Sequence, residues 1–131
     1  MAKRYVVTGG GGFVGKALIR ALRAQGSEVV SLARGVYPDL AELGAIAERV
    51  DISSSPETWR DLFSGAEGVF HTAAKVDMWG SRDGFFLTNV IGTRNVIQAC
   101  LHAGVPNLVF TSSPSVIHNG CDLVGVDETF P

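Results

Sequence analysis

The chain has 131 residues, of which 46% are hydrophobic and 18% charged, and its net charge at pH 7 is −2. This length and composition predict one soluble globular domain, and the lack of a basic stripe argues against nucleic acid as a partner. No apolar run approaches the roughly 20 residues needed to span a bilayer and the N-terminus lacks a signal-peptide apolar region, so we expect a cytoplasmic protein without a membrane span.

The first predicted elements are a strand over residues 5–7, a glycine turn over residues 8–15, a helix over residues 14–25 and a strand over residues 28–32. Within the turn, Gly9, Gly12 and Gly15 lie three positions apart. This spacing suits a tight turn, a close approach of a pyrophosphate to the backbone, and close packing of the helix on the strand. Strand, turn, helix and strand in this order favour a dinucleotide-binding unit over a purely structural glycine turn.

A nucleoside-triphosphate P-loop is the competing interpretation of the same glycines. Residues 10–16 match the first seven positions of its GxxxxGK[ST] pattern. The eighth position is Ala17, which has no hydroxyl to bind Mg²⁺, so the phosphate-transfer interpretation fails. Lys16 is then expected to be a solvent-facing helix residue.

Strands and helices continue to alternate along the rest of the chain. Further strands are predicted over residues 47–50, 68–72 and 107–111, and further helices over residues 55–64 and 83–102. Ser55 and Pro56 suit the N-cap and first position of the shorter helix. Five strands separated by helices predict an α/β fold with a doubly wound parallel sheet, the Rossmann fold, in the order 3-2-1-4-5. Ligands of such sheets bind at the carboxyl ends of the strands.

The end of the second strand bears on the choice of nicotinamide cofactor. The acid that would bind the adenosine ribose of NAD is missing from residues 32–35, and Arg34 stands beside the vacant position. A guanidinium favours a 2′-phosphate, so we expect NADP in preference to NAD, with a solvated Arg34 as the alternative. After the third strand, Asp51 is placed to accept from the adenine amino group beside Ile52. A surface turn or an N-cap is the alternative role of Asp51.

The cysteines and histidines predict no metal site. Cys100 falls on a predicted helix among apolar residues, which indicates a buried structural thiol. The three histidines, His71, His102 and His118, lack metal-ligand spacing with the two cysteines.

Taken together, these segments resemble the extended short-chain dehydrogenase/reductase superfamily over the whole chain. The shared motifs are the glycine turn, Asp51, and residues 69–74, 89–96 and 110–116. Residues 71–80 and 111–120 are most similar to the hydroxysteroid dehydrogenase branch. The resemblance implies an NAD(P)-dependent oxidoreductase that interconverts a secondary alcohol and a ketone on a small or lipid-like substrate. A nucleotide-sugar epimerase or dehydratase is the enzymatic alternative.

The resemblance also implies roles for individual residues. Ser113 aligns with the catalytic Ser/Thr that hydrogen-bonds the substrate oxygen, with turn capping by a Ser-rich segment as the alternative. Asn89 would anchor neighbouring backbone from the middle of its helix. The expected cofactor-binding residues are Thr8, Gly9, Gly12, Phe13, Val14, Gly15, Arg34, Asp51, Ile52, Thr72, Ala73, Ala74, Lys75, Asn89, Thr111 and Ser112.

One departure from the family pattern concerns the proton donor, a Tyr followed four residues later by a Lys. Tyr5 lies in the first predicted strand and Tyr37 in an early loop, and neither is followed by such a Lys. Residues 126–131 resemble the family segment that shortly precedes the Tyr–Lys motif. We therefore expect residues 1–131 to be the N-terminal, cofactor-binding part of a longer protein, inactive alone and compatible with a homodimer. A non-catalytic dinucleotide-binding module is the remaining alternative.

Overall fold

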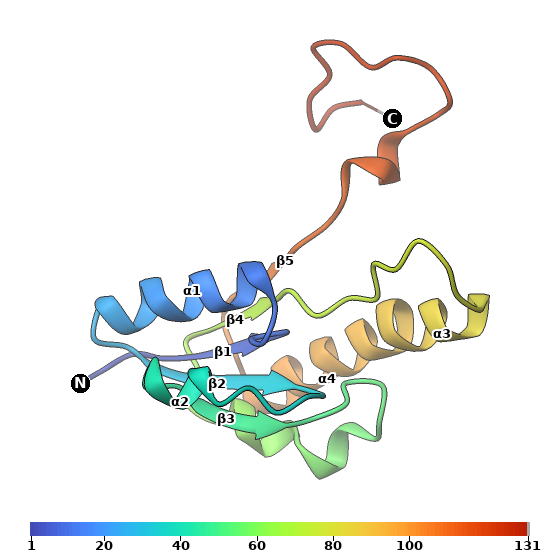
Figure 1. Ribbon diagram of the computed structural model, residues 1–131. Coiled ribbons are helices and arrows are strands. Elements are labelled where there is room, and N and C mark those ends of the chain that lie inside the picture. Colours follow the sequence, from blue (N-terminus) through green and yellow to red (C-terminus); the bar gives the residue numbers. More distant parts are fainter. Residues whose placement is uncertain (131) are drawn as a thin grey trace.

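The computed structural model describes residues 1–130 and contains a five-stranded parallel sheet in the order β3-β2-β1-β4-β5 (Figure 1). Its strands are β1 (Arg4–Thr8), β2 (Glu28–Ala33), β3 (Ile46–Arg49), β4 (Gly68–His71) and β5 (Leu108–Phe110). Each lies within one residue of its predicted bounds. The doubly wound α/β fold and its strand order are therefore confirmed.

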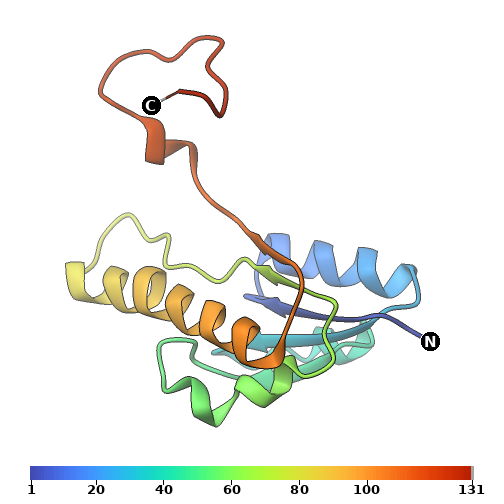
Figure 2. The same ribbon diagram turned by 180° about the vertical axis from the view of Figure 1, so that it is seen from behind.

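Helices cover both faces of the sheet (Figures 1 and 2). One face packs against α1 (Phe13–Ala24), and the other against α4 (Thr93–Ala103). Neighbouring strand residues point to opposite faces, so Val7 packs with Ile19 of α1 while Val6 packs with Val96 of α4. Burial on both faces explains why the central strands are continuous apolar runs.

Residues 55–64 do not form the predicted α-helix. They form two 3₁₀ segments, η1 (Pro56–Thr58) and η2 (Arg60–Phe63), which meet at Trp59, where φ is −141°. The Ser55 hydroxyl donates to the Glu57 carboxylate and does not cap the helix backbone. Trp59 and Phe63 are buried with their rings 5.7 Å apart, so packing of these two side chains sets the backbone here.

The long helix predicted over residues 83–102 is present but is not α-helical throughout. It comprises α3 (Arg82–Phe86), six π-helical residues called η3 (Leu87–Gly92), and α4. It begins where the Ser81 hydroxyl accepts a hydrogen bond from the Gly84 N–H at 3.1 Å, and it ends at Gly104 in the left-handed conformation. Single π turns of this kind are frequent at functional sites.

A short helix that we did not predict, α2 (Asp39–Glu42), follows β2 and tethers α1. The Lys16 ammonium lies 2.6 Å from Asp39 Oδ2 and 5.4 Å from the ring centroid of Tyr37. The prediction that Lys16 faces solvent is therefore wrong, because its side chain is only 25% exposed. This hydrogen bond also holds the pKa of the Asp39 carboxyl below its usual range.

After β5 the chain leaves the sheet, and residues 111–130 extend away from it with one 3₁₀ turn, η4 (Pro114–Ile117) (Figures 1 and 2). Cys100 of α4 is buried as predicted, and burial raises the pKa of its thiol to about 11. Within residues 1–130, every helix is too short or too polar to cross a membrane.

Candidate functional site

A cleft of about 780 Å³ opens at the carboxyl ends of β1, β2, β4 and β5. It lies at the point where the sheet order reverses between β1 and β4, which is where ligands of doubly wound sheets bind. The predicted site residues that line it are Gly9, Gly12, Phe13, Val14, Gly15, Arg34, Asp51, Ile52, Thr72, Ala73, Ala74, Lys75, Asn89, Thr111, Ser112 and Ser113. Of the residues predicted from the sequence, only Thr8 lies behind the cleft wall.

The glycines of the turn are required for different reasons. Gly9 has φ +71°, and a Cβ on Gly15 would lie 2.2 Å from the Gly9 carbonyl oxygen, so the fold itself requires glycine at both positions. A Cβ on Gly12 would have a single neighbour in the protein, the Gly9 carbonyl oxygen at 3.3 Å. Apart from this one tight contact, the space in front of Gly12 is open to the cleft that Gly12 lines.

Helix α1 presents unpaired backbone donors to this space. Its first hydrogen bond runs from the Lys16 N–H to the Gly12 carbonyl at 3.0 Å, so the N–H groups of residues 13–15 precede the helical ladder. Gly12 is the N-cap and brings no side chain, and the first turn contains no acidic residue. Free N–H groups and the positive end of the helix dipole make this turn suited to an anion.

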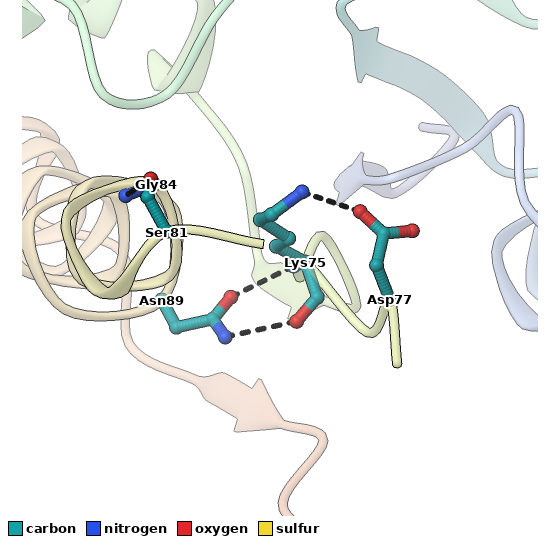
Figure 3. A network of polar contacts seen from close by, with 5 residues as sticks. All are labelled: Lys75, Asp77, Ser81, Gly84 and Asn89. Atoms are coloured by element: carbon teal, nitrogen blue, oxygen red, sulfur yellow. Dashed lines mark hydrogen bonds and ion pairs between the residues drawn. The ribbon is translucent and has the colours of Figure 1, made fainter. Parts of the chain in front are cut away.

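The loop after β4 is held by an amide clamp (Figure 3). Asn89 Oδ1 accepts from the Lys75 N–H at 2.8 Å, and Asn89 Nδ2 donates to the Lys75 carbonyl at 3.0 Å. The Lys75 ammonium pairs with Asp77, which holds the pKa of that carboxyl below its usual range, and lies 5.2 Å from the Phe85 ring centroid. Asn89 thus fixes the backbone that forms one wall of the cleft, and the π-helical segment η3 supplies it.

Arg34 and Asp51 lie at the ends of β2 and β3. Arg34 is exposed, and its carbonyl accepts from Arg49 Nε at 2.9 Å, which links the two strand ends. Asp51 Oδ1 accepts from the Ser53 N–H at 2.9 Å and from the Ser53 hydroxyl at 2.7 Å. Asp51 therefore does stabilise a turn, the alternative role considered for it, while also lining the cleft.

Asn95 is a buried polar residue that we did not single out from the sequence. Its side-chain amide donates to the carbonyls of Ile52 and Ser54 at 2.9 and 3.0 Å. These bonds run from α4 to the loop after β3. They hold Ile52 at the cleft wall, where its side chain fills the space beside Gly92.

Ser113 lies beyond β5, on the segment that leaves the sheet. Its hydroxyl is 2.8 Å from the Ser115 hydroxyl and accepts from the Ser115 N–H at 3.3 Å. Turn capping, the structural alternative, is therefore present in this conformation. Ser113 also lines the cleft.

Thr8 supports the site from behind through His71. Thr8 Oγ1 lies 2.6 Å from His71 Nδ1 and accepts from the Ala73 N–H at 3.2 Å, and His71 Nε2 lies 2.8 Å from Thr93 Oγ1. Both Thr8 and His71 are buried. Burial disfavours the charged ring and lowers the pKa of His71 to about 4.

His71 should make stability depend on pH. Its pKa is about 4 in the folded chain and 6.5 when exposed, so the unfolded chain binds more protons between these values and stability falls as pH drops through 6.5. From pH 7.5 to pH 5 we expect a loss of about 2 kcal/mol from this group. Urea unfolding of the chain and of His71→Gln measures it. A pH dependence of equal size in the two proteins would contradict the assignment.

The cleft wall also includes residues that we did not single out from the sequence, among them Tyr37, Thr88 and Thr93. Tyr37 lies against the turn, where a Cβ on Gly11 would be 2.2 Å from its ring, and Thr88 and Thr93 contribute hydroxyls from the long helix. A lone Tyr in a loop and Thr88 in a helix match no short motif, and Thr93 falls within the shared segment 89–96 without being singled out there. Within residues 1–130, His, Cys, Asp and Glu side chains form no cluster of three or more that could hold a metal ion.

The strand order, the glycine turn and a cleft at the switch point together define a Rossmann-type α/β domain. The chain belongs to the 3-beta hydroxysteroid dehydrogenase/isomerase family, whose model matches residues 6–131. The predicted membership of the extended short-chain dehydrogenase/reductase superfamily is thereby confirmed.

Relatives include the 2-alkyl-3-oxoalkanoate reductase of Stenotrophomonas maltophilia (strain K279a), 43% identical over 95% of this chain and 38% of the relative. The human sterol-4-alpha-carboxylate 3-dehydrogenase, decarboxylating, is 34% identical over 99% and 34% of the two chains. Among solved structures, a short-chain dehydrogenase/reductase superfamily protein from Agrobacterium tumefaciens with bound NAD superimposes with a TM-score of 0.84 and 31% identity, covering 98% of this chain and 38% of that one. The chain thus spans little more than a third of the length of these relatives.

Proposed function

We propose that this chain is the dinucleotide-binding part of an NAD(P)-dependent oxidoreductase that interconverts a secondary alcohol and a ketone. The observation that carries the proposal is the space left at Gly12, in front of unpaired N–H groups at the start of α1. A pyrophosphate needs both a close backbone approach and such donors. The solved Agrobacterium tumefaciens relative carries NAD, which supports a nicotinamide dinucleotide as the ligand.

The residues around the cleft fit the other parts of such a cofactor. The turn at Asp51 uses the Oδ1 atom and leaves Oδ2 to accept from an adenine ring, beside which Ile52 would pack. Ala73 and Ala74 leave room for the sugar and phosphates. When bound, the nicotinamide supplies or takes up a hydride. Ser113 would hydrogen-bond the reacting oxygen of the substrate and stabilise charge that develops there.

Arg34 supports NADP as the preferred cofactor over NAD. It lines the cleft at the end of β2, and residues 32–35 provide no carboxylate that would repel a 2′-phosphate. The acidic residue closest to Arg34 in the sequence is Asp39, which is paired with Lys16. Among the described residues 1–130, Asp39 is not one of those that line the cleft. A charge-assisted bond to the 2′-phosphate would give NADP its advantage.

Titration calorimetry with NADPH and NADH tests this preference. The chain should bind NADPH more tightly, and Arg34→Ala should weaken NADPH by about 1–3 kcal/mol while changing NADH little. Arg20→Ala, an exposed arginine on α1, is a matched control that should leave both affinities unchanged. Equal or tighter binding of NADH by the unmodified chain would rule out the NADP assignment.

A lipid-like substrate is supported by the loop after β4, which exposes large apolar side chains beside the cleft. Val76, Met78 and Trp79 are 83%, 90% and 87% exposed. The names of the reductase and sterol dehydrogenase relatives point to the same class of substrate. A nucleotide-sugar epimerase or dehydratase is the alternative, favoured by the solved UDP-glucose 4-epimerase of Stenotrophomonas maltophila with bound NAD.

We place the remaining catalytic groups outside these 131 residues, because the chain covers 38% or less of the reductase and sterol dehydrogenase relatives. A longer coding sequence with a Tyr-x-x-x-Lys motif would support the enzyme, and a protein without one would support a non-catalytic module.

The cytoplasmic location and the homodimer stay predictions. Exposed apolar residues of the long helix, among them Val90, Ile97 and Leu101, are where a second copy would pack.

A further inference from the structure

A line of hydrogen bonds runs from the buried Thr8 through His71 to Thr93, which lines the cleft. It joins β1, β4 and α4. The ring of His71 also lies face to face with Phe110 of β5, with centroids 5.5 Å apart and planes 27° apart. Each hydroxyl and each ring nitrogen in these hydrogen bonds can donate or accept. Which atom donates in each bond is therefore decided by a neighbouring group that can only donate.

The fixed end is the backbone N–H of Ala73, which can only donate. It donates to Thr8 Oγ1 at 3.2 Å, and the Thr8 hydroxyl keeps its own proton to give elsewhere. His71 Nδ1, at 2.6 Å, is the one acceptor within reach of that proton in the part of the chain that the structure describes. If Nδ1 accepts, the neutral ring carries its proton on Nε2.

The opposite tautomer, with the proton on Nδ1, would leave one donor without an acceptor. A proton on Nδ1 would point at Thr8 Oγ1, which would then receive two donors and leave the Thr8 hydroxyl proton without an acceptor. Thr8 is fully buried, and an unmet polar proton at such a site costs free energy. The low pKa of His71, which burial of the ring causes, agrees with a neutral ring.

The proton on Nε2 therefore donates to Thr93 Oγ1 at 2.8 Å. The Thr93 hydroxyl proton remains, and among residues 1–130 no acceptor for it is found. A helical Thr can donate to the carbonyl three or four residues earlier, but here the preceding turn is the π-helical segment η3, and that bond is absent from the described residues. Because Thr93 lines the cleft, a molecule bound there can supply the acceptor that this proton lacks.

We infer that Thr93 is a cofactor-binding residue whose hydroxyl donates to an oxygen of the bound dinucleotide, and that His71 is the positioning residue that fixes this hydroxyl as a donor. The inference rests on the proposed function, since it needs a dinucleotide in the cleft. It explains why a buried histidine is held between two threonine hydroxyls. A ring that accepted from Thr93 would turn that hydroxyl away from the ligand.

The tautomer can be tested without any cofactor. Long-range ¹H–¹⁵N correlation spectra of the labelled chain at neutral pH should show the His71 proton on Nε2. Addition of NADPH should then shift the Nε2 resonance, because a new bond from Thr93 changes the polarity of its oxygen. A proton on Nδ1, or an Nε2 resonance that ignores a saturating amount of NADPH, would overturn the inference.

Binding is tested with Thr93→Val, which removes the hydroxyl at nearly constant shape, and Thr93→Ser, which keeps it. NADPH should bind about two- to tenfold more weakly to Thr93→Val and close to normally to Thr93→Ser. Thr58→Val, at an exposed site outside the cleft, is the matched control. If Thr93→Val binds NADPH with unchanged affinity while the separate variant Gly12→Val has lost binding, the role of Thr93 is refuted and the proposed function stays intact. No NADPH or NADH binding by the unmodified chain would refute the proposed function itself.

Discussion

Replacement of Gly12 by Val should abolish dinucleotide binding while the fold survives. Gly12 has φ −84° and ψ 176°, which Val adopts readily, and a Cβ there meets only the Gly9 carbonyl oxygen, at 3.3 Å. The two methyl groups would then occupy the space that a pyrophosphate needs, in front of the N–H groups of α1. Circular dichroism would monitor the fold, and fluorescence titration with NADPH would monitor binding.

Two further variants make this result specific. Ala24→Val, at the exposed far end of α1, adds the same groups away from the cleft and should bind normally. Gly15→Ala should instead damage the fold, because its Cβ would lie 2.2 Å from the Gly9 carbonyl oxygen. A Gly12→Val protein with intact circular dichroism and normal affinity would show that the ligand does not lie on this turn.

The second large effect concerns turnover. The 131-residue chain should bind cofactor but show no dehydrogenase activity, because it offers no Tyr–Lys pair to supply the proton and general acid catalysis contributes about 10²–10⁴ in rate. In the longer protein that we propose, Ser113→Ala should lower kcat by about 10²–10³, the usual effect of removing one donor to a developing oxyanion. Cofactor affinity should stay nearly constant.

Ser115→Ala separates this role from turn capping. It removes the hydroxyl partner of Ser113 but leaves the Ser113 hydroxyl in place, so its effect on turnover should be far smaller. Equal losses in the two variants would mean that the turn, and not the Ser113 hydroxyl, matters for the reaction. Robust activity from the 131-residue chain alone would likewise place the chemistry elsewhere.

The central strands β1, β2 and β4 could be predicted because buried parallel strands are continuous apolar runs bounded by turn residues. The segment 55–64 shows the limit of such patterns. Ser55, Pro56 and Glu57 carry the signature of a helix start, yet the backbone that follows is set by where Trp59 and Phe63 find space in the core. That packing depends on residues far away in sequence, which a local pattern does not contain.

The site divides in the same way. Residues at strand ends could be predicted to meet, because parallel strands bring their carboxyl ends to one edge of the sheet. The positions of Tyr37, Thr93 and Asn95 could not be predicted in this way. These residues lie on a loop or a helix, and tertiary packing decides where that loop or helix sits relative to the cleft. The π-helical segment that contains Asn89 and ends just before Thr93 likewise follows from no helical spacing rule.

The most direct measurement is a titration of the ¹⁵N-labelled chain with NADPH, followed through its backbone amide resonances. If the cleft binds the dinucleotide on the glycine turn, the largest shifts should fall on residues 9–15, on Arg34, and on residues 72–75 after β4. Shifts confined to surfaces away from the carboxyl ends of the strands, or none at saturating NADPH, would contradict the proposal.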